Sequence, residues 1–390
     1  MVEKEENSKS NQEEIEITVK TRYPIGEPFK NISHRISKGT KHLVSYQLPA
    51  AGKNFKSWIK SFRGGIILIC LILVSFIPLL IGESDPVYYH TFVLAMIYAI
   101  LAASWDLLAG VTGQVSFGHA AFFGIGGYVC AYFITYLGFN LILSVIIGGF
   151  LAAVIGLIIA IPCLRFRGPY LALGTLAFSL LLFILFSMAS LKDWFWGQQG
   201  ISLPQSVVFS YTLNYSREFI TVLIFMIICI VLILAIFNSK LGTVFQAIRD
   251  NETAARAAGI NTTKYKLFSF MISAFFAGIA GSLYILHYNH AVPSIYSTTM
   301  SFYPVIMTCL GGIAMISGAV LGAYFFALSG FLIEEILRIL NIQVSSFLLT
   351  HISTLAFAVI LLIIIRFTER GILDPAIKQT KSLWDIILGK

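Results

Sequence analysis

The polar segment Ser239–Lys266 carries the residues best suited to binding another protein. It reads SKLGTVFQAIRDNETAARAAGINTTKYK, and it is basic and helix-prone. Two long apolar runs, Phe219–Phe237 and Leu267–His287, enclose it. A membrane protein gains little from such a loop unless something on that side of the bilayer holds it. The segment therefore predicts a membrane subunit whose work is driven by a partner protein.

A second set of polar residues lies inside or beside apolar segments. Gln114, Ser116 and His119 flank a glycine-rich stretch, and Thr175 follows a Gly-Pro break. Because polar groups are costly within a bilayer, those that persist there often mark a solute pathway. We therefore treat these four residues as candidates for the substrate pathway. The alternative for His119 is a hydrogen bond between helices, and for the segment around Thr175 it is the ordinary start of a span.

Metal, nucleotide and catalytic motifs are missing from the sequence. The five cysteines are scattered through apolar segments without CxxC or CxxH spacing, and the seven histidines show no metal-binding spacing. The Walker A phosphate loop is absent, so this chain is not expected to bind ATP by that route. The sequence predicts a transport subunit rather than an enzyme, with no metal site and no cofactor in this chain.

The composition indicates a membrane protein. Of the 390 residues, 57% are hydrophobic and 12% are charged, with a mean hydropathy of +0.83, whereas a soluble domain carries about 25% charged residues. A spanning helix needs about 20 mostly apolar residues. The fold class predicted is all-α and polytopic, with about eight to ten transmembrane helices, some of them broken or glycine-rich. The predicted spans are residues 63–82, 87–109, 117–137, 140–163, 170–190, 218–237, 267–287, 301–316, 318–338 and 346–366.

The positive charges predict an orientation, because Lys and Arg gather beside spans on the cytoplasmic side. They cluster before the first predicted span, after the fourth, in Ser239–Lys266 and after the tenth. The arrangement predicts a multi-pass protein of the cell (cytoplasmic) membrane, with both termini in the cytoplasm. The formal net charge of +8 then reflects membrane topology and not nucleic-acid binding.

The same pattern divides the chain into three parts. Residues 1–62 form a polar cytoplasmic tail that is predicted to be disordered, because its composition cannot bury a core. Residues 63–370 form the transmembrane domain, with a cytoplasmic loop at 239–266. Residues 371–390 form a cytoplasmic C-terminal tail.

Glycines recur at spacings of three and four in two apolar segments. Gly118, Gly124 and Gly127 lie in one, and Gly318 and Gly322 lie in the other. Such spacing stacks small residues on one helix face, and in lipid this face lets another helix approach closely. Helix packing is one interpretation, and broken helices at a midplane substrate site are the other.

Four sequence blocks together resemble a known family. They are Gly113–Tyr128, Arg165–Phe178, Ala247–Asn261 and Met307–Tyr324. Their order and spacing are similar to those of the permease subunits of branched-chain amino-acid ABC importers, most closely the M-type (LivM-like, high-affinity Leu/Ile/Val) subunits. The resemblance covers roughly residues 65–375.

The resemblance implies that Ala247–Asn261 is the ATPase-coupling loop, which in the family docks as a short helix into a groove of the ATPase. The residue types agree with this role, because an apolar patch, a shallow alanine surface and a polar rim suit a protein contact, and Gly259 can end the helix. The predicted coupling residues are Val244, Phe245, Ile248, Arg249, Asp250, Glu252, Ala255, Arg256 and Gly259.

The resemblance also implies the partners. These are two cytoplasmic ABC ATPase subunits that hold ATP and Mg, a second related (H-type) permease, and an extracytoplasmic solute-binding protein, all acting with membrane lipid around the spans. Leu, Ile and Val are the expected substrates. Urea, short amides or sugars in the same ABC class, an ATPase-independent ion-coupled carrier, and a homodimer of permeases stay open as alternatives.

Overall fold

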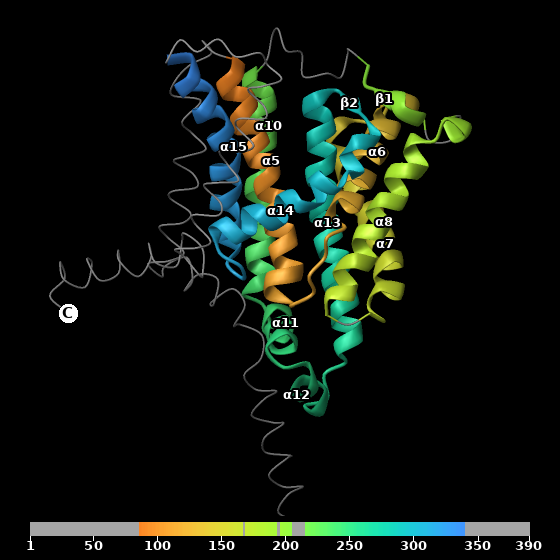
Figure 1. The fold of residues 1–390 in the computed structure, drawn as a ribbon, viewed down its shortest axis with the longest axis vertical. Helices are drawn as coiled ribbons and strands as arrows, with labels where there is room; N and C mark the ends of the chain where they lie inside the picture. The colour runs from red at the N-terminus through yellow and green to blue at the C-terminus, as the bar shows by residue number, and fades with distance from the viewer. Residues whose placement is uncertain (1–85, 167, 193–195, 205–214, 340–390) are drawn as a thin grey trace, which may run out of the picture. The chain divides into compact units, whose positions relative to one another are not determined.

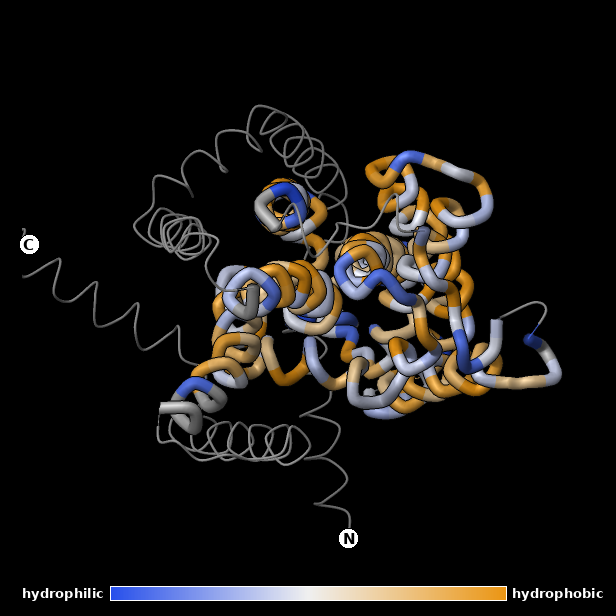
Figure 2. Tube along the Cα trace, turned by 90° about the horizontal axis from the view of Figure 1, so that it is seen from above, coloured by the Kyte–Doolittle hydropathy of each residue, from blue (hydrophilic) through white to orange (hydrophobic). Residues whose placement is uncertain are grey.

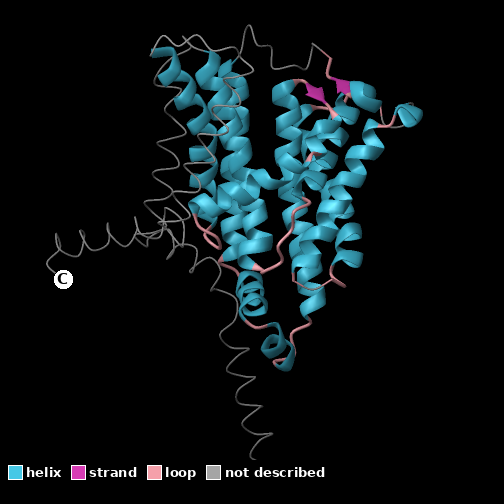
Figure 3. Cartoon of the chain, viewed as in Figure 1, coloured by secondary structure: helices cyan, strands magenta, loops and turns pink. Residues whose placement is uncertain are grey.

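The computed structural model describes residues 86–339 except 167, 193–195 and 205–214. Both predicted tails and the predicted spans 63–82 and 346–366 lie outside the described residues. What is described is almost entirely helical, with one pair of two-residue strands (Figure 3). The predicted all-α polytopic fold is confirmed.

The first half of the described chain contains four long helices. The elements, with η1 a π-helix and η2 and η3 3-10 helices, are α5 (Pro86–Asp106), η1 (Leu107–Val111), α6 (His119–Leu137), α7 (Leu141–Cys163), α8 (Pro169–Ser187), η2 (Ala189–Leu191), η3 (Gly197–Gln199) and β1 (Ile201–Ser202). The predicted break at Gly168-Pro169 is the start of α8, where the proline occupies the first turn.

The second half contains the polar loop and the remaining long helices. The elements, with η4 a 3-10 helix, are α10 (Tyr215–Phe237), α11 (Lys240–Asp250), α12 (Glu252–Ala257), α13 (Thr262–Tyr288), β2 (His290–Ala291), η4 (Pro293–Tyr296), α14 (Thr298–Gly311) and α15 (Ile316–Ile339). The predicted loop therefore forms two short helices between two long ones.

Within the described part, six helices are long and apolar enough to cross a membrane: α5 with η1, α6, α7, α8, α10 and α13. The helices α14 and α15 pass the same test together as a pair, bent by 112° at the break between them. Because α14 has 14 residues and is about 21 Å long, it cannot cross a hydrocarbon core of about 30 Å by itself. The prediction of a separate span at 301–316 is therefore wrong, whereas α15, with 24 residues, is long enough to match the predicted span at 318–338.

Glycines let the central helices pack closely. Helix α13 lies against α5, α6 and α7, and a Cβ added at Gly281 would lie 1.8 Å from the carbonyl oxygen of Phe123 on α6. A Cβ at Gly126 would lie 2.2 Å from the carbonyl oxygen of Gly278. Since lipid tails are as apolar as the side chains, such close backbone packing stabilises helix pairs in a membrane.

The five glycines predicted at packing faces all lie at close contacts. Added Cβ atoms at Gly118, Gly124 and Gly127 would collide with Thr175, Tyr296 and Ile285 respectively. Those at Gly318 and Gly322 would collide with the backbone of Gly311 and Met307, so these two positions join α15 to α14.

Apolar side chains also cover the outside of the bundle. Ile158 on α7 and Leu173 on α8 are more than half exposed, and α5 in contrast is buried along almost its whole length. Orange, which marks hydrophobic residues, predominates along the helices in Figure 2. Exposed apolar faces of this kind suit contact with lipid or with another membrane subunit.

The bundle has two distinct ends. Helices α11 and α12 project from one end, and the antiparallel pair of β1 and β2 lies at the other (Figure 1). Helix α13 connects them, and its 27 residues give it a length of about 40 Å. We refer to these as the α11–α12 end and the β1–β2 end.

Candidate coupling site

Helix α11 is an amphipathic helix whose apolar side faces the bundle. Ser239 begins it, because its hydroxyl accepts hydrogen bonds from the backbone N–H groups of Leu241 and Gly242. Its buried residues are Gly242, Phe245 and Ile248, which follow one another at a spacing of three and so share one face. A Cβ at Gly242 would lie 2.0 Å from the carbonyl oxygen of Phe237, so the turn from α10 requires glycine.

This burial corrects the predicted apolar docking patch. Phe245 is 0% and Ile248 3% exposed, Ala255 on α12 is also buried, and Val244 is half-buried. These side chains pack against other parts of this chain, which removes their apolar surface from water without any partner protein. The outward surface of α12 and of the turn after it consists instead of Thr253, Ala254, Arg256, Ala257, Ala258 and Gly259, all exposed.

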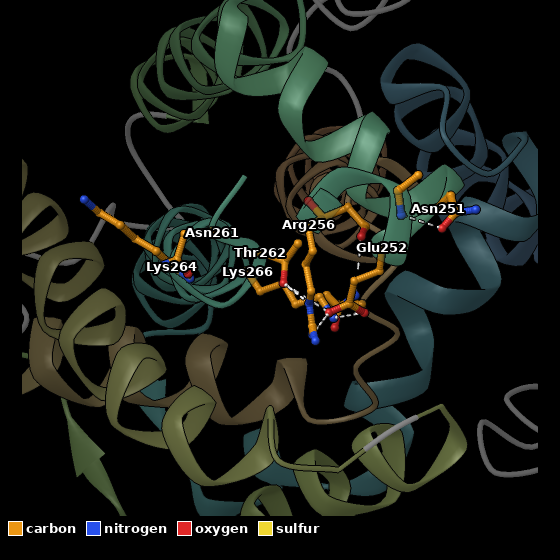
Figure 4. Close-up of polar contacts among 10 residues, drawn as sticks. Asn251, Glu252, Arg256, Asn261, Thr262, Lys264 and Lys266 are labelled. Atoms are coloured by element: carbon orange, nitrogen blue, oxygen red, sulfur yellow. Dashed lines mark hydrogen bonds and ion pairs between the residues drawn. The ribbon is translucent and has the colours of Figure 1, made fainter. Parts of the chain in front are cut away.

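Glu252 holds α12 to the start of α13. One carboxylate oxygen accepts hydrogen bonds from Arg256 and from the Thr262 hydroxyl, the latter over 3.2 Å. The other oxygen accepts from Lys266 Nζ over 2.7 Å. Figure 4 shows these side chains converging, with the helix caps Asn251 and Asn261 on either side. The network spans 14 residues of sequence and fixes a helix that is only six residues long.

The environment of Glu252 favours its charged form. Burial works to raise the pKa of this carboxyl, but hydrogen bonds and charges from Lys266 and Arg256 outweigh burial and hold the pKa below its ordinary value. The network therefore stays charged at neutral pH.

Arg249 at the end of α11 reaches back into the bundle. Its Nη1 donates a hydrogen bond to the carbonyl oxygen of Gly110 in η1 over 3.1 Å. Its Nε and Nη2 both donate to the Asp250 carboxylate over 3.0 Å, which orients the guanidinium. The loop after η1 lies against the aliphatic part of the Arg249 side chain, since a Cβ added at Gly113 would lie 3.0 Å from Arg249 Cγ.

A cavity of about 920 Å³ lies between α11–α12 and two other segments. It is lined by the loop after η1, by the turn and first residues around the start of α8, and by charged residues of the polar loop. The main polar lining residues are Gln114, Arg249, Asp250, Asn251, Glu252, Arg256 and Lys266. Three of the four blocks singled out in the sequence thus meet around one cavity.

Comparison with known proteins identifies the family. Residues 88–366 match the model of the family described as "Branched-chain amino acid transport system / permease component", and this segment is more than half of the chain. The chain belongs to this permease family.

Individual relatives agree with the family match. The High-affinity branched-chain amino acid transport system permease protein LivM of Escherichia coli (strain K12) is 27% identical over 339 residues, covering 78% of each chain. The protein of the same name from Salmonella typhimurium is 26% identical over 64% of this chain and 63% of its own length. A probable LivH permease of Methanocaldococcus jannaschii is 25% identical over 68% of this chain and 84% of its own length. No solved structure matches.

The protein is accordingly a permease subunit of an ABC importer and an integral, multi-pass membrane protein. The comparisons do not favour the alternatives of an ion-coupled carrier or of another solute class.

Of the four predicted pathway residues, only Gln114 lines the cavity of the permease. Ser116 is buried, and its carbonyl oxygen accepts a hydrogen bond from the Trp105 indole over 2.7 Å. Thr175 is buried as well, and its hydroxyl accepts from the backbone N–H of Phe117 over 3.1 Å. Both residues fix the loop that follows η1.

His119 belongs to the packing of the permease helices. Its Nε2 lies 2.9 Å from the Ser273 hydroxyl on α13, which in turn donates to the carbonyl oxygen of Ser104 on α5 over 2.7 Å. The side chain is fully buried. The alternative of a hydrogen bond between helices therefore describes His119 in this structure.

Sequence reasoning missed a second polar cluster, at the β1–β2 end of the permease. His287 on α13 contacts the Glu218 carboxylate on α10 through Nδ1, and its Nε2 lies 2.6 Å from His90 Nδ1 on α5. Glu218 and His287 are buried. An acidic residue in the first turn of a span was the only local signal, because His287 lies 69 positions from Glu218 and 197 positions from His90.

Proposed function

We propose that this permease moves branched-chain amino acids (Leu, Ile and Val) inward by alternating access, driven by ATP hydrolysis on separate subunits. The names of the LivM relatives support this substrate class. Two cytoplasmic ABC ATPase subunits hold the ATP and Mg, and this chain carries out no covalent chemistry.

The observation that carries the coupling role is the polar projection formed by α11 and α12. It stands outside the bundle (Figure 1), its apolar residues are turned inward, and its outer surface combines Arg256 with small residues. Such a surface suits insertion into a groove of a soluble protein. In this proposal Phe245, Ile248 and Ala255 anchor the loop, and the exposed residues of α12 contact the ATPase.

Charge supports the orientation. Lys240, Arg249, Arg256, Lys264 and Lys266 belong to the polar loop at the α11–α12 end, and Lys192 and Arg217 are the described basic residues near the opposite end. The excess of positive residues assigns the α11–α12 end to the cytoplasm. With the predicted spans 63–82 and 346–366 included, both chain termini are proposed to be cytoplasmic, and the β1–β2 end is proposed to face the solute-binding protein.

A second permease completes the membrane part of the importer. Relatives named LivH also match this chain at 25% identity, so an H-type permease is the proposed partner. The exposed apolar faces of α7 and α8 supply surface for lipid or for that subunit.

The cavity of about 920 Å³ is the proposed inner mouth of the solute path. Its volume accommodates an amino acid, since small-molecule sites measure about 300–1,000 Å³. Gln114 is the proposed contact for a polar group of the solute, and Ser116, His119 and Thr175 support the walls around it.

Reconstitution with the candidate ATPase and H-type permease subunits tests the proposal. Replacing Ala258 by Trp on the exposed surface is expected to abolish both ATPase co-purification and ATP-driven leucine uptake. The matched control is Gln198→Trp, an exposed position at the β1–β2 end, which leaves co-purification intact. Leucine uptake that persists without any ATPase, or that follows an ion gradient, would overturn the proposal.

A further inference from the structure

We propose that Arg249, Gly110 and Asp106 form a positioning link that carries movement of the coupling helix α11 to the bend between α14 and α15. The inference rests on the proposed coupling to an ATPase, and it assigns the route inside this chain. Of these residues only Arg249 lines the cavity. Together they join α11, η1 and the bend between α14 and α15.

The first contact of the link joins α11 to η1. Arg249 Nη1 donates to the carbonyl oxygen of Gly110, 139 residues away in sequence. Because Asp250 holds the other guanidinium nitrogens, the fork has one orientation, and a rigid planar fork transmits displacement better than a flexible ammonium group. The stem of Arg249 also lies against Gly113, so α11 cannot shift without moving the loop after η1.

The second part of the link is η1 itself. Residues Leu107–Val111 form a buried π-helical turn at the end of α5. Such turns are rare and are found most often as single turns at functional sites. Because η1 ends at Val111, the carbonyl oxygen of Gly110 lies in the last turn of the helix and can accept a hydrogen bond from a side chain outside it. Thr112 closes the turn, because its hydroxyl donates to the carbonyl oxygen of Leu107 over 3.1 Å.

The third contact joins the start of η1 to the bend. Asp106 is fully buried, and its Oδ1 accepts a hydrogen bond from the backbone N–H of Ala314 over 2.7 Å. Gly110 lies against the same atoms, because an added Cβ would be 2.0 Å from Asp106 Oδ1 and 2.6 Å from Ala314 N. Arg249, Gly110, Asp106 and Ala314 are thus in continuous contact.

The bend is the element able to change state. Ala314 has φ +64°, a region that L-residues other than Asn and Asp seldom adopt, and Gly312, two residues earlier, has φ +121°. Such backbone persists only where surrounding contacts hold it, and the Asp106 carboxylate is one of those contacts. A pull on α11 that moved Gly110 would displace Asp106 and release or tighten the 112° bend.

The test measures leucine transported per ATP hydrolysed in proteoliposomes that contain the complete importer. Arg249→Gln and Asp106→Ala are each expected to lower this ratio at least about fivefold, the lower limit of typical coupling between sites. ATPase co-purification should stay at the wild-type level. Asp106→Asn, which keeps an oxygen facing Ala314 N, should restore most of the ratio. Lys264→Gln, which removes a positive charge from an exposed residue of the same loop, is the matched control and should leave the ratio unchanged.

The double variant Arg249→Gln/Asp106→Ala separates one link from two independent effects. Residues that act through one chain of contacts give non-additive losses, so the double variant should fall no further than the more impaired single variant. Independent losses that multiply, or an Arg249→Gln variant with the wild-type ratio, would overturn the link. If Asp106→Ala fails to fold, Arg249→Gln still tests the link by itself, because a wild-type ratio in that variant would overturn it. Absence of ATPase binding by the wild-type chain would instead refute the proposed function, so the two failures are distinguishable.

Discussion

The two polar clusters at opposite ends of α13 are each centred on a glutamate and differ in their exposure to solvent. At the α11–α12 end, Glu252 binds Arg256, Thr262 and Lys266, and its side chain is 35% exposed. At the β1–β2 end, Glu218 contacts His287, and their side chains are 8% and 3% exposed. Each carboxylate joins α13 to a neighbouring helix.

The difference in burial indicates different roles. A charge-assisted contact that solvent can screen contributes little to stability and can be exchanged for a partner's contacts. A buried contact is costly to break, because the group left behind loses both its partner and water. The Glu252 network therefore suits a movable surface helix, and the Glu218 cluster suits a fixed joint between α5, α10 and α13.

Breaking the buried joint should have the largest effect. Glu218→Ala leaves His287 buried beside His90 without its carboxylate, and the expected loss is about 3–5 kcal/mol of stability. Thermal unfolding of the purified protein in detergent measures it. Replacing Glu218 and His287 together by Leu should recover most of the loss, since paired apolar residues need no hydrogen bond. Equal stability of wild type and Glu218→Ala would contradict a structural joint.

Disturbing the middle of α13 should affect both clusters at once. Gly281→Ala places a Cβ 1.8 Å from the carbonyl oxygen of Phe123, so α6 and α13 must separate at an expected cost of about 3 kcal/mol. Hydrogen exchange should then increase at both ends of α13. Gly330→Ala is the control, because an added Cβ there meets nothing within 4 Å. A change confined to one end would show that the clusters are independent of the helix between them.

Breaking the exposed network should have a small effect on global stability and a large local one. Glu252→Gln removes the charge that binds Lys266 and Arg256, and we expect a loss of about 1 kcal/mol or less after screening by solvent. Helix α12 has six residues, too few to be stable alone, so its amide protons should exchange much faster. Unchanged protection of α12 would mean that its caps and Ala255 suffice to hold it.

The smallest effect expected is that of mild acid on the same network. Because the pKa of Glu252 lies below its ordinary value of 4.5, the stabilisation is present above that value and is lost as the pH falls through the lowered pKa. The amide hydrogen-exchange rates of α12, corrected for the intrinsic pH dependence of exchange, should be equal at about pH 7.5 and 5.5. Raising the salt concentration to about 1 M should weaken the network at either pH, since the Debye length falls to about 3 Å. Loss of protection already at pH 5.5 would refute the lowered pKa.

Several elements followed directly from the sequence. The apolar segments gave α5, α6, α7, α8, α10 and α13 close to their observed bounds, because apolar length alone decides whether a helix suits the bilayer. The polar loop, and Arg249, Glu252 and Arg256 within it, stood out for the same reason. The hydrogen-bond partner of Arg249 could not be predicted from the sequence, since Gly110 lies 139 residues away.

The errors have a common cause. Residues 301–316 are apolar enough for a span, but α14 is too short to cross alone and meets α15 at a bend of 112°, where the N–H of Ala314 donates to Asp106 from another helix. The burial of Phe245 and Ile248 likewise depends on which surface lies behind α11. Local composition thus determined what enters the membrane and what stays outside it, because transfer from water acts on each segment separately. Only the tertiary structure decided which polar groups meet, because hydrogen bonds and close backbone contacts require partners that are distant in sequence.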